Sequence, residues 1–300
     1  EQQSHDDKLQ YRIGWLFLYG VGTGKDEAAA REWFERASKL GNPHAQYQLA
    51  RMILDAPSST PEQTAQALEW LTKAAEAGQD CAQYAFGKIY REGQEIEKDI
   101  QQAVELFTLA AEQGNSFAAF ALGKLYLSGD AGLPIDPPSA LKWLTFSAEL
   151  GNQFAQYRLG KLLLQGEEVP KDTEAAIRWL TAAAEQGNQY AQYALGKLYL
   201  LGKEVPKDKS NAIKWFQLAA DQGNEYAKYF LEHMDDRLGQ PPAAAVISLL
   251  HHLANIFQEQ SQPPSDGIRV AVDRKLLRKI KAKKIAQGHK ADDHEPEMKF

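Results

Sequence analysis

The stretch Ala176–Asp208, which reads AIRWLTAAAEQGNQYAQYALGKLYLLGKEVPKD, decides the fold of this chain. It begins with an amphipathic run around Trp179 and is interrupted by a Gly-Asn pair at Gly187. A second run carries a glycine in its middle, Gly196, and is followed by a Gly corner and the letters Val-Pro-Lys-Asp. Variants of this block fill most of the 300 residues, so the chain is organised as a repeat.

The repeat has a period of 36 to 37 residues. Its junction glycine recurs at Gly41, Gly78, Gly114, Gly151, Gly187 and Gly223. A Trp stands eight residues before most of these glycines, and a second, mid-helix glycine stands nine residues after most of them. A fixed period of this length is typical of a solenoid built from identical supersecondary units.

Each unit is predicted to contain two helices. The first runs from the Ala of the AQY segment to the Gly corner, and its glycine lets the partner helix approach closely, at a cost in helix propensity of up to about 1 kcal/mol. The second helix begins at an aligned N-cap residue, which is Asp26, Asp99, Asp136, Asp172 or Asp208. Repeat two uses Thr60-Pro61 instead, with Gln63 completing a capping box. Each second helix should end in a left-handed glycine.

A two-helix unit cannot bury its apolar face alone, so the units must stack. The sequence predicts an all-α, right-handed α-solenoid of six to seven two-helix repeats over residues 1–239, with a seventh first helix from Glu225 to Leu238. Residues 240–260 are predicted to form a C-terminal capping helix with an apolar stripe at Val246, Leu249, Leu250, Leu253 and Phe257. Residues 261–300 are predicted to be a linker and a basic tail.

The segment AQYALGKLYLLGKEVPKDKSNAIKWFQLAADQGN resembles the SEL1-like repeat, a relative of the tetratricopeptide repeat, and the resemblance covers about residues 8–235. The chain departs from the pattern at Ala50, at Leu106 and in two longer loops, which affects loops and packing only. The resemblance implies an adaptor that binds other proteins, has no catalytic chemistry of its own and needs no cofactor.

Composition limits the alternatives. No apolar run approaches the roughly 18–20 residues that span a bilayer, and the N-terminus lacks the basic and apolar regions of a signal peptide. Cys81 is the one cysteine, which fits a reducing compartment, so we expect a cytoplasmic location. Because the first residue is Glu1, we also expect an excised piece of a longer protein. No phosphate loop, nucleophile elbow, catalytic carboxylate pair or zinc spacing is present in the sequence.

The side chains left over from repeat packing form columns on the first helices, which by analogy with tetratricopeptide repeats should line a concave groove. Counted from the mid-helix glycine, the position one after is a lysine in four repeats: Lys88, Lys124, Lys161 and Lys197. The position six before is aromatic in the C-terminal half: Phe117, Phe154, Tyr190 and Tyr226. The position three before is aromatic throughout and includes Tyr157 and Tyr193. These ten residues are our predicted partner-binding site.

The predicted ligand of this groove is an acidic extended peptide or helix, because lysines supply charge and rings supply buried area. Two alternatives stay open. The Tyr column can serve repeat packing and the lysines a solvated face. The groove can also bind single-stranded nucleic acid, although residues 1–268 hold 24 basic and 35 acidic residues, a net charge of −11 that disfavours this.

The tail is basic: residues 269–290 hold nine Lys or Arg and one Asp. An amphipathic helix there could bind DNA through a cluster of cations: Arg274, Lys275, Arg278, Lys279, Lys281, Lys283 and Lys284. Docking against an acidic solenoid is another possibility, and a membrane is disfavoured because the segment lacks Trp and Phe. His289, Asp292, Asp293 and His294 have no buried setting that would organise them as metal ligands, so no metal site is predicted.

The C-terminal sequence LLRKIKAKKIAQGHKADDHE, after PPAAAVISLLHHLANIFQE, resembles the C-terminal end of relaxases from conjugative and mobilisable elements of Gram-positive bacteria. The resemblance covers about residues 240–296. It implies an accessory region of a DNA-nicking protein, a context that also suits an excised C-terminal piece. None of the relaxase catalytic motifs is recognisable in these 300 residues, so the resemblance assigns no catalytic residue to this chain.

Overall fold

The computed structural model describes residues 2–56, 59–93, 96–130 and 132–232. Thirteen α-helices account for the regular structure of these ranges. The first helices of successive repeats are α1 (Gln2–Tyr19), α3 (Pro43–Leu54), α5 (Asp80–Glu92), α7 (Ser116–Ser128), α9 (Gln153–Gln165), α11 (Gln189–Leu201) and α13 (Glu225–Glu232). The second helices are α2 (Glu27–Lys39), α4 (Pro61–Glu76), α6 (Ile100–Glu112), α8 (Pro137–Glu149), α10 (Thr173–Glu185) and α12 (Lys209–Asp221).

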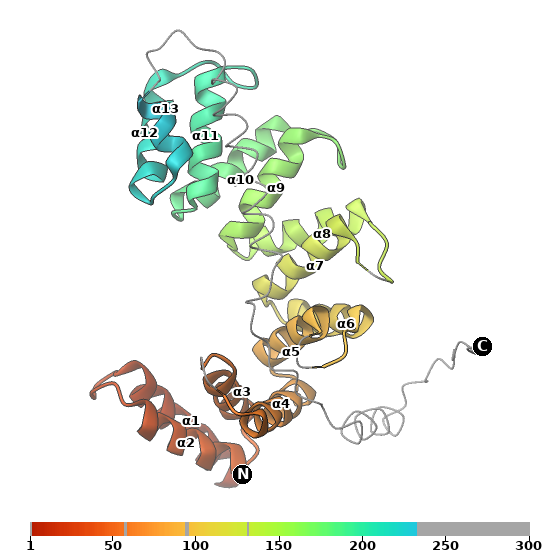
Figure 1. Cartoon of the computed structure of the whole chain (residues 1–300), viewed down its shortest axis with the longest axis vertical. Coiled ribbons are helices and arrows are strands. Elements are labelled where there is room, and N and C mark those ends of the chain that lie inside the picture. Colours follow the sequence, from red (N-terminus) through yellow and green to blue (C-terminus); the bar gives the residue numbers. More distant parts are fainter. Residues whose placement is uncertain (1, 57–58, 94–95, 131, 233–300) are drawn as a thin grey trace, which may run out of the picture.

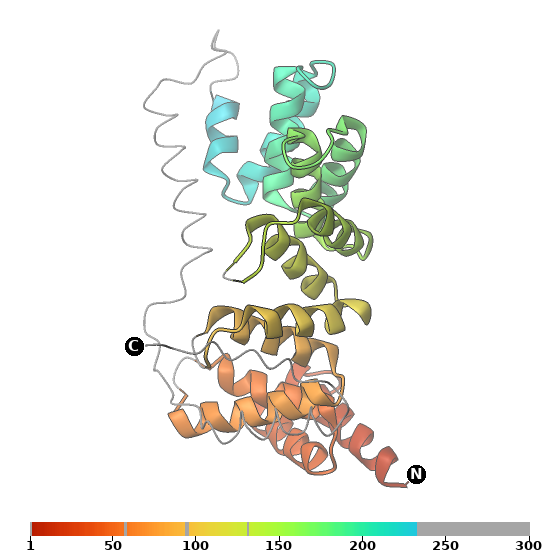
Figure 2. The same cartoon turned by 90° about the vertical axis from the view of Figure 1, so that its right-hand side faces the viewer.

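These helices stack in chain order into an elongated, curved array, with α1 and α2 at one end and α12 and α13 at the other (Figures 1 and 2). Each helix packs chiefly against its neighbours in sequence, as in a solenoid. The predicted all-α solenoid is therefore confirmed. The seventh first helix is present as α13 up to Glu232, whereas the rest of its predicted span, the capping helix 240–260 and the linker and tail 261–300 lie outside the described residues.

The predicted caps are present. Asp26 accepts a hydrogen bond from the backbone N–H of Ala29 at 2.9 Å, and the four aligned aspartates cap their helices in the same way. Thr60 and Gln63 exchange the two hydrogen bonds of a capping box at 3.3 and 2.9 Å. These side chains satisfy N–H groups that the helix itself leaves unpaired, so each second helix has a fixed start.

The junction between two repeats is a Schellman turn followed directly by the next N-cap. Gly187 has a φ of 91°, and the N–H of Asn188 donates to the carbonyl of Ala183 at 3.0 Å. The side-chain oxygen of Asn188 then accepts from the N–H groups of Tyr190 and Ala191. The junction asparagine thus closes α10 and starts α11, a double role that the sequence reasoning missed.

The interior of each hairpin is filled by the residue that follows the recurring Trp position, and not by the Trp itself. Phe216 is fully buried, and a Cβ placed on Gly196 would lie 2.7 Å from its ring, so the predicted close approach of the two helices is confirmed. Trp179 is half-buried and packs on a cluster that contains Leu144 of the preceding repeat and Leu159 of its own repeat. The Trp column therefore connects repeats, and this fixes the spacing of the first helices that carry the candidate site.

Candidate functional site

The two predicted aromatic columns meet as pairs across repeat boundaries. The ring three positions before one mid-helix glycine lies beside the ring six positions before the next. The centroid distances of the pairs in the C-terminal half are 6.2 Å for Tyr84–Phe117, 6.4 Å for Phe120–Phe154, 6.0 Å for Tyr157–Tyr190 and 6.0 Å for Tyr193–Tyr226. Tilted pairs at such distances are mutually attractive. The first helices therefore share one aromatic row, which we call the ring row.

The two columns of the ring row are buried to different degrees. Tyr193 packs on the buried ring of Phe216 at 5.9 Å, and burial, followed by the neighbouring Tyr226 and Tyr157, raises its pKa to about 12. Phe117 and Phe154 are 52% and 46% exposed. The inner column thus serves packing as well, as the alternative interpretation of the sequence held, and the outer column presents apolar area to solvent.

The predicted lysines flank the ring row. Lys124 Nζ lies 5.7 Å from the centroid of Phe120, which is within the range of a cation–π contact. Burial lowers the pKa of Lys124, and the nearby charges of Arg91 and Arg158 lower it further. Burial also lowers the pKa of Lys161, and the next contributions come from Arg158 and Lys197. Cations that depress each other's pKa form a region of positive potential.

Two arginines belong to this region although the sequence reasoning did not select them. Arg158 stands two positions before its mid-helix glycine, and Arg91 stands four after. Positions −6, −3, −2 and +1 are spaced like one helix face, so the periodicity that selected the lysines also predicts position −2. Position −2 is charged in two of the seven first helices, as Arg12 in α1 and Arg158 in α9. Because the charge does not recur from repeat to repeat, the sequence showed no basic column at this position.

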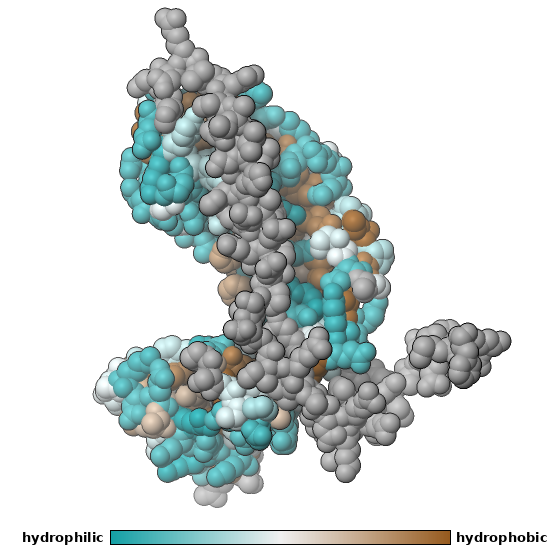
Figure 3. Space-filling model, in the orientation of Figure 1, coloured by the Kyte–Doolittle hydropathy of each residue, from teal (hydrophilic) through white to brown (hydrophobic). Residues whose placement is uncertain are grey.

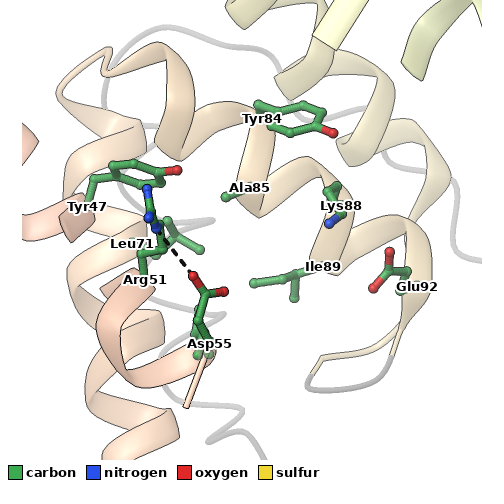
Figure 4. A pocket seen from close by; sticks show the side chains of 10 residues that line it. Tyr47, Arg51, Asp55, Leu71, Tyr84, Ala85, Lys88, Ile89 and Glu92 are labelled. Carbon is green, nitrogen blue, oxygen red and sulfur yellow. Dashed lines mark ion pairs between the residues drawn. The ribbon is translucent and has the colours of Figure 1, made fainter. Parts of the chain in front are cut away.

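The N-terminal half of the same face differs because its two arginines, Arg51 and Arg91, are paired internally. Between α3 and α5 lies a hollow of about 300 Å³, with Tyr47, Arg51 and Asp55 on one side and Tyr84, Lys88 and Glu92 on the other (Figure 4). Arg51 forms an ion pair with Asp55 at 3.3 Å, and Arg91 forms one with Glu92 at 3.2 Å. Lys124 and Lys197, in contrast, form no ion pair with any residue in the described ranges.

Cys81 is not activated as a nucleophile. Burial raises the pKa of its thiol, and Asp80 raises that pKa further, which disfavours the reactive thiolate. Within the described part of the chain, no three His, Cys, Asp or Glu side chains are grouped to hold a metal ion. No helix of that part has the length and apolarity needed to cross a bilayer.

The seven tail cations predicted to bind DNA lie outside the described residues. The surface is mostly hydrophilic on the face shown in Figure 3, with scattered hydrophobic patches.

Repeated helical hairpins of this length, stacked in register with an exposed row of rings and cations, define a repeat protein of the solenoid class. The Sel1 repeat model matches residues 8–42, 43–79, 82–115, 116–152, 153–188 and 189–224, so the chain belongs to the Sel1 repeat family. These ranges coincide with the six helix pairs. Sel1 repeats generally mediate protein–protein interaction.

Two solved structures resemble the whole array. A Sel1 repeat protein from Oxalobacter formigenes is 33% identical with a TM-score of 0.68, and the match covers 77% of this chain and 66% of that one. The protein c5321, described as a protective antigen of uropathogenic Escherichia coli with an SLR fold, is 27% identical with a TM-score of 0.67, over 94% of this chain and 54% of that one. The chain thus spans about two thirds and about half of these relatives. No curated protein sequence matches it.

Proposed function

We propose that this chain is a non-catalytic scaffold that binds an acidic, extended segment of a protein partner along repeats three to six. The observation that supports this proposal is that the exposed ring row lies beside lysines that form no ion pair with any described residue. Lys124 and Lys197 stand there in a protein whose residues 1–268 have a net charge of −11. Rings supply buried area at low entropy cost, and complementary charge supplies steering and specificity.

The internal ion pairs of the N-terminal half limit where the acidic part of the partner binds. Asp55 and Glu92 already neutralise Arg51 and Arg91, so an incoming carboxylate gains less there. In the free chain, repulsion from neighbouring cations contributes to the lowered pKa of Lys124 and Lys161. A carboxylate of the partner bound beside these lysines would relieve that repulsion. The acidic residues of the partner therefore bind to the C-terminal half of the face, and apolar side chains of the partner that lie between its acidic residues contact Phe117 and Phe154.

A direct test uses fluorescein-labelled peptides of about a dozen residues in which Glu alternates with Leu, compared with the same peptides carrying Gln in place of Glu. We expect saturable, salt-sensitive binding of the Glu peptide and weak binding of the Gln peptide. The double variant Lys124→Glu/Lys197→Glu should lose the binding. Pull-down of partners with the triple variant of Lys124, Lys161 and Lys197 to Glu extends the test to natural ligands.

The matched control is Lys142→Glu/Lys214→Glu. Both lysines lie over Trp rings on second helices, at 5.1 and 5.3 Å, so the control makes the same charge change on another face. The control should bind the Glu peptide like the unaltered chain. Equal binding by the Lys124/Lys197 variant, or equal loss in the control, refutes this site.

The C-terminal region adds a proposal of its own. As the accessory region of a conjugation or mobilisation relaxase, the tail would bind DNA through its cluster of cations at residues 274–284, and truncation after Gly267 would abolish a salt-sensitive DNA affinity. These residues lie outside the described ranges, and this alternative, like the absence of catalysis and the cytoplasmic location, stays a prediction from the sequence. Equal DNA binding by the truncated and intact chains excludes the tail.

A further inference from the structure

Tyr47 is the exception in the inner column of the ring row, three positions before the mid-helix residue. The other described rings of that column each lie beside a second ring, as Tyr84 lies beside Phe117. Tyr47 has no ring contact in the described part of the chain. The position beside it, six before the next mid-helix glycine, holds Cys81, whereas the next four first helices have Phe or Tyr there. The ring row is therefore interrupted between α3 and α5.

The hollow of about 300 Å³ between α3 and α5 borders on this ring. Tyr47 and Tyr84 stand on two of its sides, and Ala85 and Ile89 point into it from α5 (Figure 4). The buried Leu71 of α4 also lines it. A lining of rings and aliphatic side chains favours an apolar group, and the volume lies at the low end of the roughly 300–1,000 Å³ of ligand pockets. The hollow therefore suits one large side chain of a bound peptide.

The charges that line the hollow cancel. Its two basic residues are Arg51 and Lys88, and its two acidic residues are Asp55 and Glu92, so the lining has no net charge. The later repeats lack this balance because the acidic position, five after the mid-helix residue, is uncharged in the next three first helices: Ser128, Gln165 and Leu201. A carboxylate or a guanidinium in the hollow would meet repulsion as well as attraction. A neutral ring with a polar tip instead finds an apolar lining and, at the rim, both donors and acceptors.

We propose that this hollow binds one tyrosine or tryptophan side chain of the partner, next to the acidic segment that binds along the later repeats. The ring of the partner packs on Tyr47, beside which the described chain places no ring of its own. Its O–H or N–H donates to a carboxylate at the rim, Asp55 or Glu92. The inference rests on the proposed function, because the same partner supplies the acidic residues. It adds an anchor that decides which acidic segments bind tightly.

The C-terminal part of this chain does not have the sequence of such an occupant. Residues 233–300 contain two rings, Phe257 and Phe300, and neither Tyr nor Trp. Residues 269–290 hold nine Lys or Arg and one Asp, which is the opposite charge to the segment that the lysines of the later repeats favour. A neutral ring joined to an acidic stretch therefore points to a partner protein.

The experiment titrates the full chain into fluorescein-labelled peptides that join the alternating Glu/Leu segment to one variable residue. Packed helices lie about 10 Å apart and an extended chain advances about 3.3 Å per residue, so the variable residue stands about five positions from the nearest Glu. It is placed before the segment in one series and after it in another, to cover both chain directions. In one series we expect tyrosine or tryptophan to bind at least about tenfold more tightly than alanine. Arginine or glutamate should gain no more than about twofold.

A second probe separates this inference from the proposed function. N-acetyltyrosinamide carries no acidic segment, and saturation-transfer NMR at millimolar concentration detects whether it binds the full chain. We expect a signal that N-acetylleucinamide does not give and that Tyr47→Leu removes. If this probe binds while the Glu/Leu peptide does not, the hollow is an aromatic site and the proposed function is wrong. If the Glu/Leu peptide binds, yet tyrosine adds no affinity and the probe gives no signal, this inference alone is wrong.

Variants of the chain locate the site. Ala85→Phe fills the hollow from α5, at a position where α9 accommodates the long side chain of Arg158. It should reduce the affinity ratio of the tyrosine and alanine peptides to about one, as should Tyr47→Leu, with unchanged helicity. Ala194→Phe is the matched control, because Ala194 has the same position in α11, and it should leave the ratio unchanged. A larger gain from arginine or glutamate than from tyrosine, or a ratio that survives both Ala85→Phe and Tyr47→Leu, would overturn the proposal.

Discussion

Asn115 and Asp80 are joined across a repeat boundary by a 2.9 Å hydrogen bond, in which Asn115 Nδ2 donates to Asp80 Oδ2. Asn42 and Asp7 form the same bond at 2.9 Å. In both cases the aspartate lies on one first helix and the asparagine caps the next. Each junction asparagine has two donor hydrogens to satisfy besides its capping oxygen, so this aspartate completes the junction.

The next junction lacks that partner, and we expect Ser116→Asp to restore it. Asn152 is buried, and its Nδ2 has no acceptor among the described residues. Ser116, the first residue of α7, stands where Asp80 stands in α5. An aspartate there supplies the acceptor and also suits the positive end of α7, for a gain of about 1 kcal/mol in the free energy of unfolding. Urea denaturation followed by circular dichroism measures it.

The control for this prediction is Asn152→Asp, which keeps the N-cap oxygen and removes the donor hydrogens. Ser116→Asp should not stabilise a chain that already carries Asn152→Asp, since two carboxylates would then face each other. An equal gain in both backgrounds shows that the effect comes from the helix end alone and contradicts the proposed hydrogen bond.

The buried Gln156 and the more exposed Gln186 form a second polar connection, and we expect the effect of removing one to depend on the presence of the other. Gln186 Nε2 donates to Gln156 Oε1 at 2.7 Å, while Gln156 Nε2 donates to the carbonyl of Ala148. Repeat four has Ala119 and Leu150 at the two corresponding positions. Gln156→Ala should cost about 1–3 kcal/mol because the carbonyl of Ala148 loses its donor and Gln186 loses its acceptor.

The double variant Gln156→Ala/Gln186→Leu reproduces the apolar pair of repeat four and should recover part of that loss. A double-mutant cycle on the free energy of unfolding gives the coupling directly. Strictly additive single costs would show that the two glutamines act independently, contrary to the observed hydrogen bond.

Much of this architecture was predictable because it depends on local chemistry. N-cap aspartates, the capping box at Thr60 and the left-handed junction glycines act within a few residues of chain, and each is read directly from spacing. The period itself implied stacking. The close approach at Gly196 followed from the absence of a side chain in the middle of an apolar helix.

The features that were missed involve contacts between helices that are distant in the sequence. The bond of Asn115 to Asp80 crosses a repeat boundary, and the bond of Gln186 to Gln156 joins the two helices of one repeat. These partners are 35 and 30 positions apart, and no local pattern distinguishes such a polar residue from a solvated one. The same limit applies to the site. The sequence named both aromatic columns, but only coordinates pair the rings across repeats and bring Arg158 beside Lys124 and Lys161.

The mid-helix glycine offers a test of packing against propensity. Gly196→Ala improves helix propensity by about 1 kcal/mol, yet its Cβ would lie 2.7 Å from Phe216. We expect the strain to win, with a net loss of about 1–3 kcal/mol in thermal or urea unfolding. Repeat two already carries Ala50 at this position, buried beside Leu71, so Ala50→Gly is the converse control and should cost about 1 kcal/mol. A stabilised Gly196→Ala chain would show that α12 can move aside.

The lowered pKa values of Lys124 and Lys161 predict how binding depends on pH. Burial and neighbouring cations hold the pKa of both amines below the ordinary lysine value of about 10.4. The protonated amines bind the acidic peptide. As the pH rises, the affinity for the peptide should therefore start to fall at a lower pH than it would if both lysines had the ordinary pKa. A bound carboxylate favours the charged form and raises both pKa values again, so binding in that pH window must take up protons.

The stability of the free chain should respond to these two groups with the opposite sign. Between the lowered pKa and 10.4, the unfolded chain binds more protons at these lysines than the folded chain, so their contribution to the free energy of unfolding rises with pH. Calorimetric titration of the Glu peptide in two alkaline buffers of different ionisation enthalpy counts the protons taken up. Lys124→Gln/Lys161→Gln should abolish most of this uptake, and Lys142→Gln/Lys214→Gln should leave it unchanged. Proton release on binding, or uptake that persists without Lys124 and Lys161, would place the acidic ligand elsewhere on the array.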